Sequence, residues 1–119
     1  MTTVFYSHEI CLNHNPGLGH PESPERLKSI YSILEDDHFG VLQRKQAPRA
    51  DPAVTYLMHD PFYVDRVLSN VPREGYAFLD PDTILSPGSI EAALRAVGGL
   101  CDAVDLVMAG RADNAFCAL

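Results

Sequence analysis

Apolar side chains recur along the chain with two different periods, and these periods predict the order of its secondary structure. Residues 3–6 are β-branched and aromatic, which predicts a first strand. Residues 23–37 then carry apolar side chains every three or four positions, which is the spacing of a helix. A weaker apolar stretch at residues 41–45 predicts a second strand. The first half of the chain therefore alternates between strand and helix.

A capping residue followed by proline marks the start of four expected helices. These pairs are Ser23-Pro24, Asp51-Pro52, Asp60-Pro61 and Ser86-Pro87. The second and third helices are short and end by Pro72, and we expect Phe62 and Tyr63 to lie in the core. The last helix is expected to run to Gly110 and to bury one apolar stripe. This stripe consists of Ile90, Leu94, Val97, Cys101, Val104 and Met108.

The remaining segments predict a loop and a final strand. Residues 72–89 are rich in Pro, Gly and Asp, which is typical of a long loop. Residues 115–119 form a continuous apolar run, which is typical of a parallel strand covered on both faces. The order of strands and helices predicts an α/β fold in one domain over residues 1–119. Because the apolar run is unbroken at Leu119, we expect this domain to be partial, cut through a larger fold.

Composition and charge exclude several classes of function. The net charge is −7, with nine Lys plus Arg against sixteen Asp plus Glu, which argues against nucleic-acid binding. No basic run suggests binding to an anionic membrane surface, and no apolar stretch is long enough to span a bilayer. Three cysteines without a C-x-x-C pair favour free thiols, so we expect a cytoplasmic protein.

Histidine and cysteine residues near the N-terminus leave two interpretations open. His8, Cys11 and His14 are three residues apart, and mixed His and Cys ligands are common in zinc sites. The paired spacing of structural zinc sites is absent, however, so we favour a loop whose imidazoles hydrogen-bond to neighbouring groups. Residues 36–38 contain an Asp-x-His pair, but they lie at a charged helix end, which indicates a solvated surface turn.

The most distinctive stretch is His-Pro-Glu-Ser-Pro-Glu-Arg-Leu at residues 20–27, which follows a loop rich in Gly and Pro. It resembles the HPExPxRL loop near the N-terminus of the histone deacetylase superfamily, particularly its bacterial class II-like amidohydrolases. The resemblance continues through residues 79–89, 92–94 and 114–116. It implies an arginase-like three-layer fold with a mainly parallel sheet, of which this chain forms the truncated N-terminal part.

The resemblance also implies an activity. Enzymes of this superfamily hydrolyse acetyl-lysine or a related acyl amide with a zinc ion that polarises the carbonyl and activates water. Their catalytic His pair, zinc ligands and oxyanion-stabilising Tyr would all follow Leu119. We therefore expect this chain to contain no catalytic residue and no metal ligand, to bind no cofactor, and to be inactive alone.

Four residues match positions that contact substrate or line the channel in the family. Asp82 matches the acid that grips the substrate backbone, although its surroundings are also good turn-forming sequence. His20 and Pro21 match residues of the tunnel wall. Arg26 matches the Arg of the internal channel, and a salt bridge to Glu22 in the same turn is compatible with that role.

Three functions stay open at this point. The first is a part of a zinc-dependent deacetylase that binds an acyl-amide substrate. The second is a non-enzymatic oligomeric interaction module, or a subunit of a split enzyme. The third is a small metal-binding protein that uses the His and Cys residues of the N-terminal loop. Apolar surface at residues 90–108 and 115–119 also leads us to expect a homo-oligomer.

Overall fold

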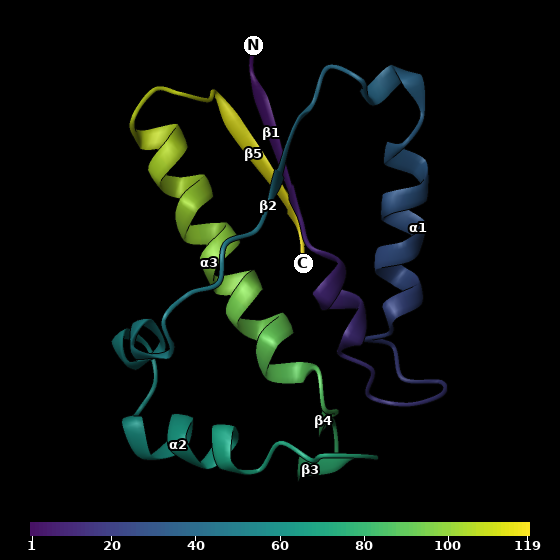
Figure 1. The fold of residues 1–119 in the computed structure, drawn as a ribbon, viewed down its shortest axis with the longest axis vertical. Coiled ribbons are helices and arrows are strands. Elements are labelled where there is room, and N and C mark those ends of the chain that lie inside the picture. Colours follow the sequence, from purple (N-terminus) through teal and green to yellow (C-terminus); the bar gives the residue numbers. More distant parts are fainter.

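Three parallel strands form the central sheet in the order β2-β1-β5 (Figure 1). A computed structural model describes all of residues 1–119. The strands are Thr3–Ser7 for β1, Gln43–Gln46 for β2 and Asn114–Ala118 for β5. Strand β1 lies in the middle, where Phe5 pairs with Arg44 on one side and with Phe116 on the other.

Two helices cover opposite faces of this sheet. Helix α1 spans Pro24–Leu34 and helix α3 spans Ser89–Met108, and Figure 1 shows the sheet between them. Because successive side chains of a strand point to opposite faces, β1 contributes to a core on each side. The α3-side core contains Val4, Tyr6, Ala47, Ala103, Leu106 and Ala112. The α1-side core contains Phe5, Cys11, Leu27, Leu34 and Ala118. These three layers confirm the predicted α/β fold with a parallel sheet.

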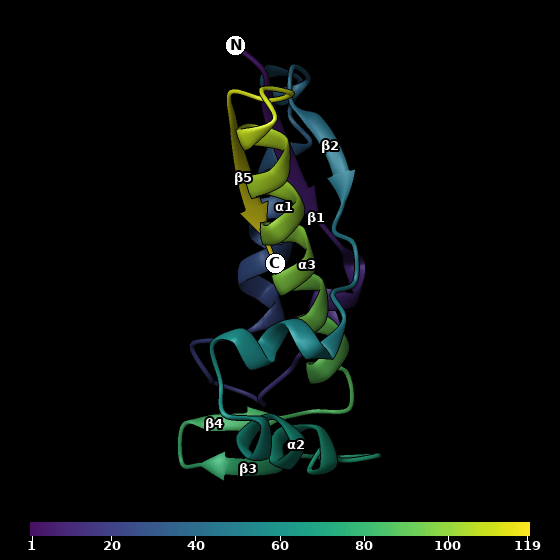
Figure 2. The ribbon, with the colours of Figure 1, turned by 90° about the vertical axis from the view of Figure 1, so that its left-hand side faces the viewer.

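Shorter elements connect and extend the layers. Short 3-10 helices occupy Glu9–Asn13, Asp37–Phe39 and Pro52–Leu57, and helix α2 spans Pro61–Ser69. Strands β3 (Ala77–Asp80) and β4 (Thr83–Leu85) form an antiparallel hairpin. Both ribbon views show α2 and the hairpin beyond the carboxyl ends of the sheet strands (Figures 1 and 2). None of the helices combines the length and the apolar character needed to cross a bilayer.

The expectation of a continuous loop over residues 72–89 is wrong, because this segment contains the hairpin. Its turn is closed by Asp80, whose Oδ1 accepts the backbone N–H groups of Asp82 and Thr83 at 2.8 Å each. The same Pro, Gly and Asp residues that suggested a loop therefore make a tight turn. Two short strands pair on either side of it.

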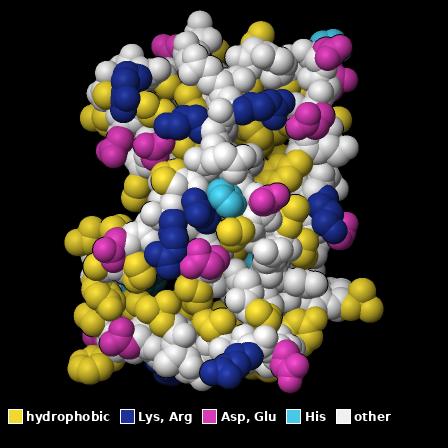
Figure 3. Space-filling view, viewed as in Figure 1, with side chains coloured by type: hydrophobic (Ala, Val, Ile, Leu, Met, Phe, Trp, Pro, Cys, Tyr) yellow, Lys and Arg dark blue, Asp and Glu magenta, His cyan; other side chains and the backbone are white.

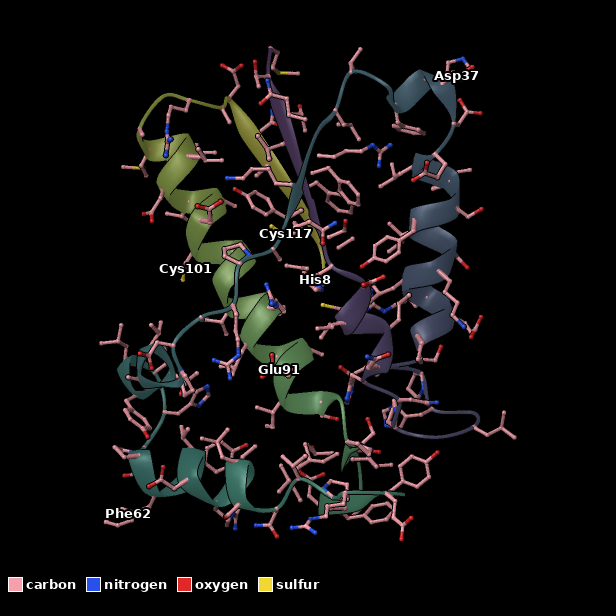
Figure 4. The ribbon with its side chains drawn as sticks, viewed as in Figure 1. His8, Asp37, Phe62, Glu91, Cys101 and Cys117 are labelled. Atoms are coloured by element: carbon pink, nitrogen blue, oxygen red, sulfur yellow. The ribbon has the colours of Figure 1, made fainter.

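Helix α3 begins later than expected, at Ser89, and it buries only the first part of the predicted apolar stripe, where Leu94 is 3% exposed. Met108 and Cys101 are exposed, and Figure 4 shows Cys101 on the side of α3 away from the sheet. Gly98 is buried instead, since a Cβ atom there would lie 2.0 Å from the carbonyl oxygen of Pro48. Because the segment after β2 approaches α3 so closely, α3 packs against it through a face that carries small residues.

The expectation that Phe62 and Tyr63 are core residues is also wrong. Phe62 is 86% exposed and Tyr63 is 43% exposed, because α2 buries only Val64. Figure 4 shows Phe62 at the outer end of α2, pointing away from the other elements. Hydrophobic side chains gather over α2 and the preceding 3-10 turn in Figure 3. This surface contains Leu57, Met58 and Phe62.

Candidate functional site

A pocket opens at the carboxyl ends of β1 and β5. The chain leaves β1 through α1 to reach β2 on one side, whereas β5 lies on the other side of β1. Open α/β sheets bind ligands where the strand order diverges in this way. The pocket has a volume of about 310 Å³, and Cys11 and Leu119 line it at the sheet. Its position is therefore the one at which this type of sheet places a binding site.

The pocket has an apolar interior and a charged mouth. Its apolar wall comes mainly from β4 and the first turns of α3, together with one residue each of α1 and α2. This wall contains Leu27, Val67, Ile84, Leu85, Ile90, Ala92, Ala93 and Ala96. The titratable or hydroxyl-bearing residues include His14, Glu22, Arg26, Asp82 and Ser89. An apolar cavity with a few polar groups at one end is typical of sites that bind small ligands.

Two of the four residues expected to contact a ligand line this pocket. These are Asp82 on the hairpin and Arg26 on α1. His20 lies beside them, since its Nε2 atom is 3.3 Å from the carbonyl oxygen of Asp82. Pro21 is exposed and does not line the pocket. The salt bridge considered for Arg26 is not formed, because Glu22 contacts His14 instead.

The hairpin turn fixes the backbone of Asp82. The carboxylate of Asp80 accepts the Thr83 hydroxyl as well as two backbone N–H groups, at 2.8 Å in each case. The Thr83 hydroxyl, followed by the N–H of Asp82, lowers the pKa of Asp80. Asp80 therefore stays ionised and keeps the turn closed. The carboxylate of Asp82 makes no hydrogen bond to the chain and is free to contact a ligand.

The pocket also contains a hydrogen-bonded cluster that the sequence did not single out. His14 Nδ1 lies 2.7 Å from the Ser89 hydroxyl, and His14 Nε2 lies 3.3 Å from a carboxylate oxygen of Glu22. Ser86 joins the cluster through its N–H, which donates to Ser89 Oγ at 2.8 Å. The sequence singled out His14 as an N-terminal imidazole, but it did not indicate Ser86 and Ser89 as its partners.

The N-terminal His and Cys residues make separate contacts. His8, which lies just past β1 in Figure 4, accepts the Ile10 N–H through Nδ1 at 3.1 Å. Cys11 is buried, with its Sγ 3.9 Å from the carbonyl oxygen of Ala92, and burial raises the pKa of its thiol. These are the contacts of a hydrogen-bonded loop. No group of three or more His, Cys, Asp or Glu side chains is positioned to hold a metal ion.

The surface-turn interpretation of residues 36–38 is confirmed. Asp36 accepts the backbone N–H of His38 at 2.9 Å, and the His38 side chain is 91% exposed. The N–H of His38 and then its side chain lower the pKa of Asp36. This contact is local and lies far from the pocket at the other end of α1, as the label of Asp37 in Figure 4 indicates.

Comparisons with known proteins agree with this architecture. The chain is 31% identical over 132 residues to a histone deacetylase-like amidohydrolase of Pseudomonas aeruginosa, covering 96% of this chain and 34% of that protein. It is 30% identical over 121 residues to a probable deacetylase of Archaeoglobus fulgidus, covering 98% and 33%. The crystal structure of the HDA15 HD domain superposes with a TM-score of 0.90 at 25% identity, covering 99% and 35%.

The chain thus spans about a third of the length of these proteins. The family model for the histone deacetylase domain matches residues 20–119, which include α1, the hairpin, α3 and β5. This match covers most of the chain, and it begins at His20. The chain therefore belongs to the histone deacetylase domain family.

Proposed function

We propose that this chain forms the pocket wall and rim of a zinc-dependent deacetylase that hydrolyses acetyl-lysine or a related acyl amide. One observation carries the proposal: Asp82 and Arg26, from separate elements, line one apolar pocket at the carboxyl edge of the sheet. Asp82 accepts N–H groups of the substrate backbone, because an ionised carboxylate is a strong acceptor. Arg26 offers guanidinium donors deeper in the channel, and His20 borders the mouth beside Asp82, whereas Pro21 lies outside the pocket.

Zinc, which this activity requires, does not fit the residues of this chain. No cluster of His, Cys, Asp or Glu side chains forms a metal site, and His14 is engaged by Ser89 and Glu22. The part played by this chain is accordingly to bind and orient the acyl amide and to exclude water from it. We expect no deacetylation by this chain alone.

The test is a titration of the isotope-labelled chain with an acetyl-lysine amide, followed by NMR. We expect the amide signals of Asp82, Thr83 and Ile84 to shift, and the unacetylated lysine amide to bind more weakly. Asp82→Asn should weaken binding about tenfold or more, because a hydrogen bond to a charged group contributes about 1.5–3 kcal/mol. Asp37→Asn removes an exposed carboxylate far from the pocket and serves as the matched control. Equal binding by all three proteins would contradict the proposal.

A second function is favoured by a different observation. Strand β5 pairs only with β1, so its other edge is open, and Phe116 on this strand is 48% exposed. Open strand edges pair with other strands. In this second function the chain is an oligomeric interaction module, or one subunit of a split enzyme. Its state of association in solution distinguishes these functions from ligand binding by a monomer.

A further inference from the structure

A run of hydrogen bonds and one charged contact passes around the mouth of the pocket. It begins at Ser89 on α3 and continues through His14, Glu22 and His20 of the rim loop, which is residues 14–23 between the first 3-10 helix and α1. The contact between His14 and Glu22 is the charged one. His20 then contacts the carbonyl oxygen of Asp82, from which β4 leads back along the chain toward Ser89. We call these five residues the collar. It links the rim loop, the hairpin and the start of α3 into one closed path.

The hydroxyl groups beneath the collar fix the proton positions of His14. The Ser86 hydroxyl is used by the rim loop, since it accepts an N–H and donates to a carbonyl oxygen within residues 13–15, at 3.0 and 3.1 Å. Ser89 Oγ accepts the Ser86 N–H, and its own proton has two acceptors within reach, His14 Nδ1 at 2.7 Å and Ser86 Oγ at 3.2 Å. We assign it to the nearer one, His14 Nδ1. His14 Nε2 then carries the hydrogen and lies 3.3 Å from a carboxylate oxygen of Glu22.

His20 has the same tautomer for a different reason. Its Nδ1 atom accepts the backbone N–H of Glu22 at 3.1 Å, so this nitrogen carries no hydrogen. Its Nε2–H therefore donates to the carbonyl oxygen of Asp82. Each of the two imidazoles thus accepts through Nδ1 and carries its hydrogen on Nε2, and His20 Nε2 donates across to the hairpin.

The base of the collar is buried, so its bonds constrain the pocket. Ser86 and Ser89 are each 4% exposed, and breaking their contacts would leave polar atoms without partners away from water. We infer that His14 and His20 are positioning residues: His20 holds the backbone of Asp82, and His14 holds the rim loop at the start of α3, so that the pocket mouth keeps the geometry that a ligand meets. The identity of that ligand rests on the proposed function, whereas the collar itself does not.

The first arm of the test uses the chain without ligand. NMR of the imidazole nitrogens should show Nδ1 as the unprotonated nitrogen of both His14 and His20 at neutral pH. His20→Gln keeps a donor near the place of Nε2, whereas His20→Asn does not. We expect His20→Asn to speed hydrogen exchange at the Asp82 and Thr83 amides about tenfold, and His20→Gln to restore most of the protection.

His14 allows the complementary pair of changes. His14→Asn keeps a polar group near Nδ1 for Ser89 and loses Glu22, whereas His14→Gln keeps the contact to Glu22 and loses Ser89. Because Ser89 is buried and Glu22 is not, His14→Gln should loosen the rim loop more than His14→Asn. His38→Asn is the matched control, since His38 is an exposed histidine with only local contacts. It should leave the hairpin unchanged.

The second arm adds an acetyl-lysine amide, and its outcomes separate the two ideas. Weaker binding by His20→Asn than by His20→Gln supports the positioning role. If Nδ1 carries the hydrogen in the chain without ligand, or if His20→Asn leaves hairpin exchange unchanged, the collar is overturned whatever the ligand does. If the collar signals are present but the unmodified chain binds no acetyl-lysine amide, the proposed function fails while the collar stands.

Discussion

The hydroxyl group of Tyr6 donates to Asp102 Oδ2 at 2.5 Å and so joins the middle strand of the sheet to α3. Lys45 on β2 donates to the same oxygen at 2.7 Å, and its ammonium nitrogen lies 5.5 Å from the centre of the Tyr6 ring. The hydrogen bond from Lys45, and then that from Tyr6, lowers the pKa of Asp102. Burial, and then the contact with Asp102, raises the pKa of Tyr6.

The first prediction follows from this contact. Tyr6→Phe removes a hydrogen bond to a charged group, so the free energy of unfolding should fall by about 1.5–3 kcal/mol at pH 7. Urea unfolding measures the change. Tyr6→Phe keeps the aromatic ring in the core and serves as the least disruptive change. A variant as stable as the unmodified chain would show that the bond contributes nothing to folding.

The same variant has a defined pH dependence. Because the folded-state pKa of Tyr6 is raised above its ordinary value of 10.0, its contribution is complete below pH 10 and is lost as pH rises through the folded pKa. The stability difference between the two proteins should therefore shrink above pH 10. Tyr31 also has a pKa raised by burial, so the free energy of unfolding of Tyr6→Phe should still fall above pH 10, but less steeply than that of the unmodified chain. Identical alkaline slopes would contradict this account.

The second prediction concerns the packing of α3. A Cβ atom at position 98 would lie 2.0 Å from the carbonyl oxygen of Pro48 and 2.8 Å from the backbone nitrogen of Ala50. Gly98→Ala should therefore push the segment after β2 away from α3 and lower the free energy of unfolding by about 1–3 kcal/mol or more. Gly40→Ala, which meets only a carbonyl oxygen at 3.2 Å, should stay within about 1 kcal/mol of the unmodified chain. Thermal or urea unfolding measures both.

The order of elements could be predicted from the sequence except for the β3–β4 hairpin, whereas the buried face of α3 could be predicted only in part. Strand β1 follows from a β-branched and aromatic run, β5 from an apolar run, and the start of α1 from Ser23-Pro24, and all three signals act locally. The face of α3 depends instead on how closely another segment approaches it. Gly98 makes that approach possible, and the spacing of apolar residues in the sequence does not indicate it. A stripe chosen by apolar character therefore included the buried Leu94 but also Cys101, Val104 and Met108, which the structure exposes.

The candidate site was predictable only where the resemblance reached it. The family match named Asp82 and Arg26, and the fold brings both to one pocket. His14 and Ser89 are 75 positions apart in the sequence, and nothing in their spacing indicates that their side chains meet at 2.7 Å. Contacts of this kind arise from the crossing of the rim loop over α3. They become visible only in three dimensions.

The third prediction concerns the hairpin turn at acid pH. The pKa of Asp80 is lowered, so its contribution to the turn is complete above the ordinary value of 3.8 and is lost as pH falls through the folded pKa. The amide signal of Thr83 should therefore move toward an unfolded position below pH 3.8. Asp80→Asn should show a weakened turn at neutral pH and no such acid transition.

NMR titration of the Thr83 amide from pH 6 to pH 2 measures the effect. Asp37→Asn is the control, because Asp37 lies at the opposite end of the molecule from the hairpin and should leave the titration of Thr83 unchanged. If Asp80→Asn retains the full acid transition, another group must close the turn.

The last prediction is that the chain associates through β5. This strand pairs only with β1, and its Phe116 is 48% exposed although it stacks on Phe5 with ring centres 5.9 Å apart. The outer side of α3 adds two exposed apolar residues, Leu100 and Val104. Because an open strand edge beside apolar surface recruits a second strand, we expect self-association at high micromolar concentration.

Light scattering over a dilution series measures this association. Phe116→Lys places a charge on the open strand, which natural proteins use to prevent edge pairing, so it should shift the chain toward monomer by about tenfold in concentration. Phe78→Lys is the matched control, because Phe78 is 66% exposed but lies on the hairpin and not on the central sheet. It should leave the association unchanged if β5 is the contact. Two outcomes would show that β5 is not an interface: an unmodified chain that is monomeric at high micromolar concentration, or an equal effect of both substitutions. Either outcome would favour a monomer that acts through its pocket.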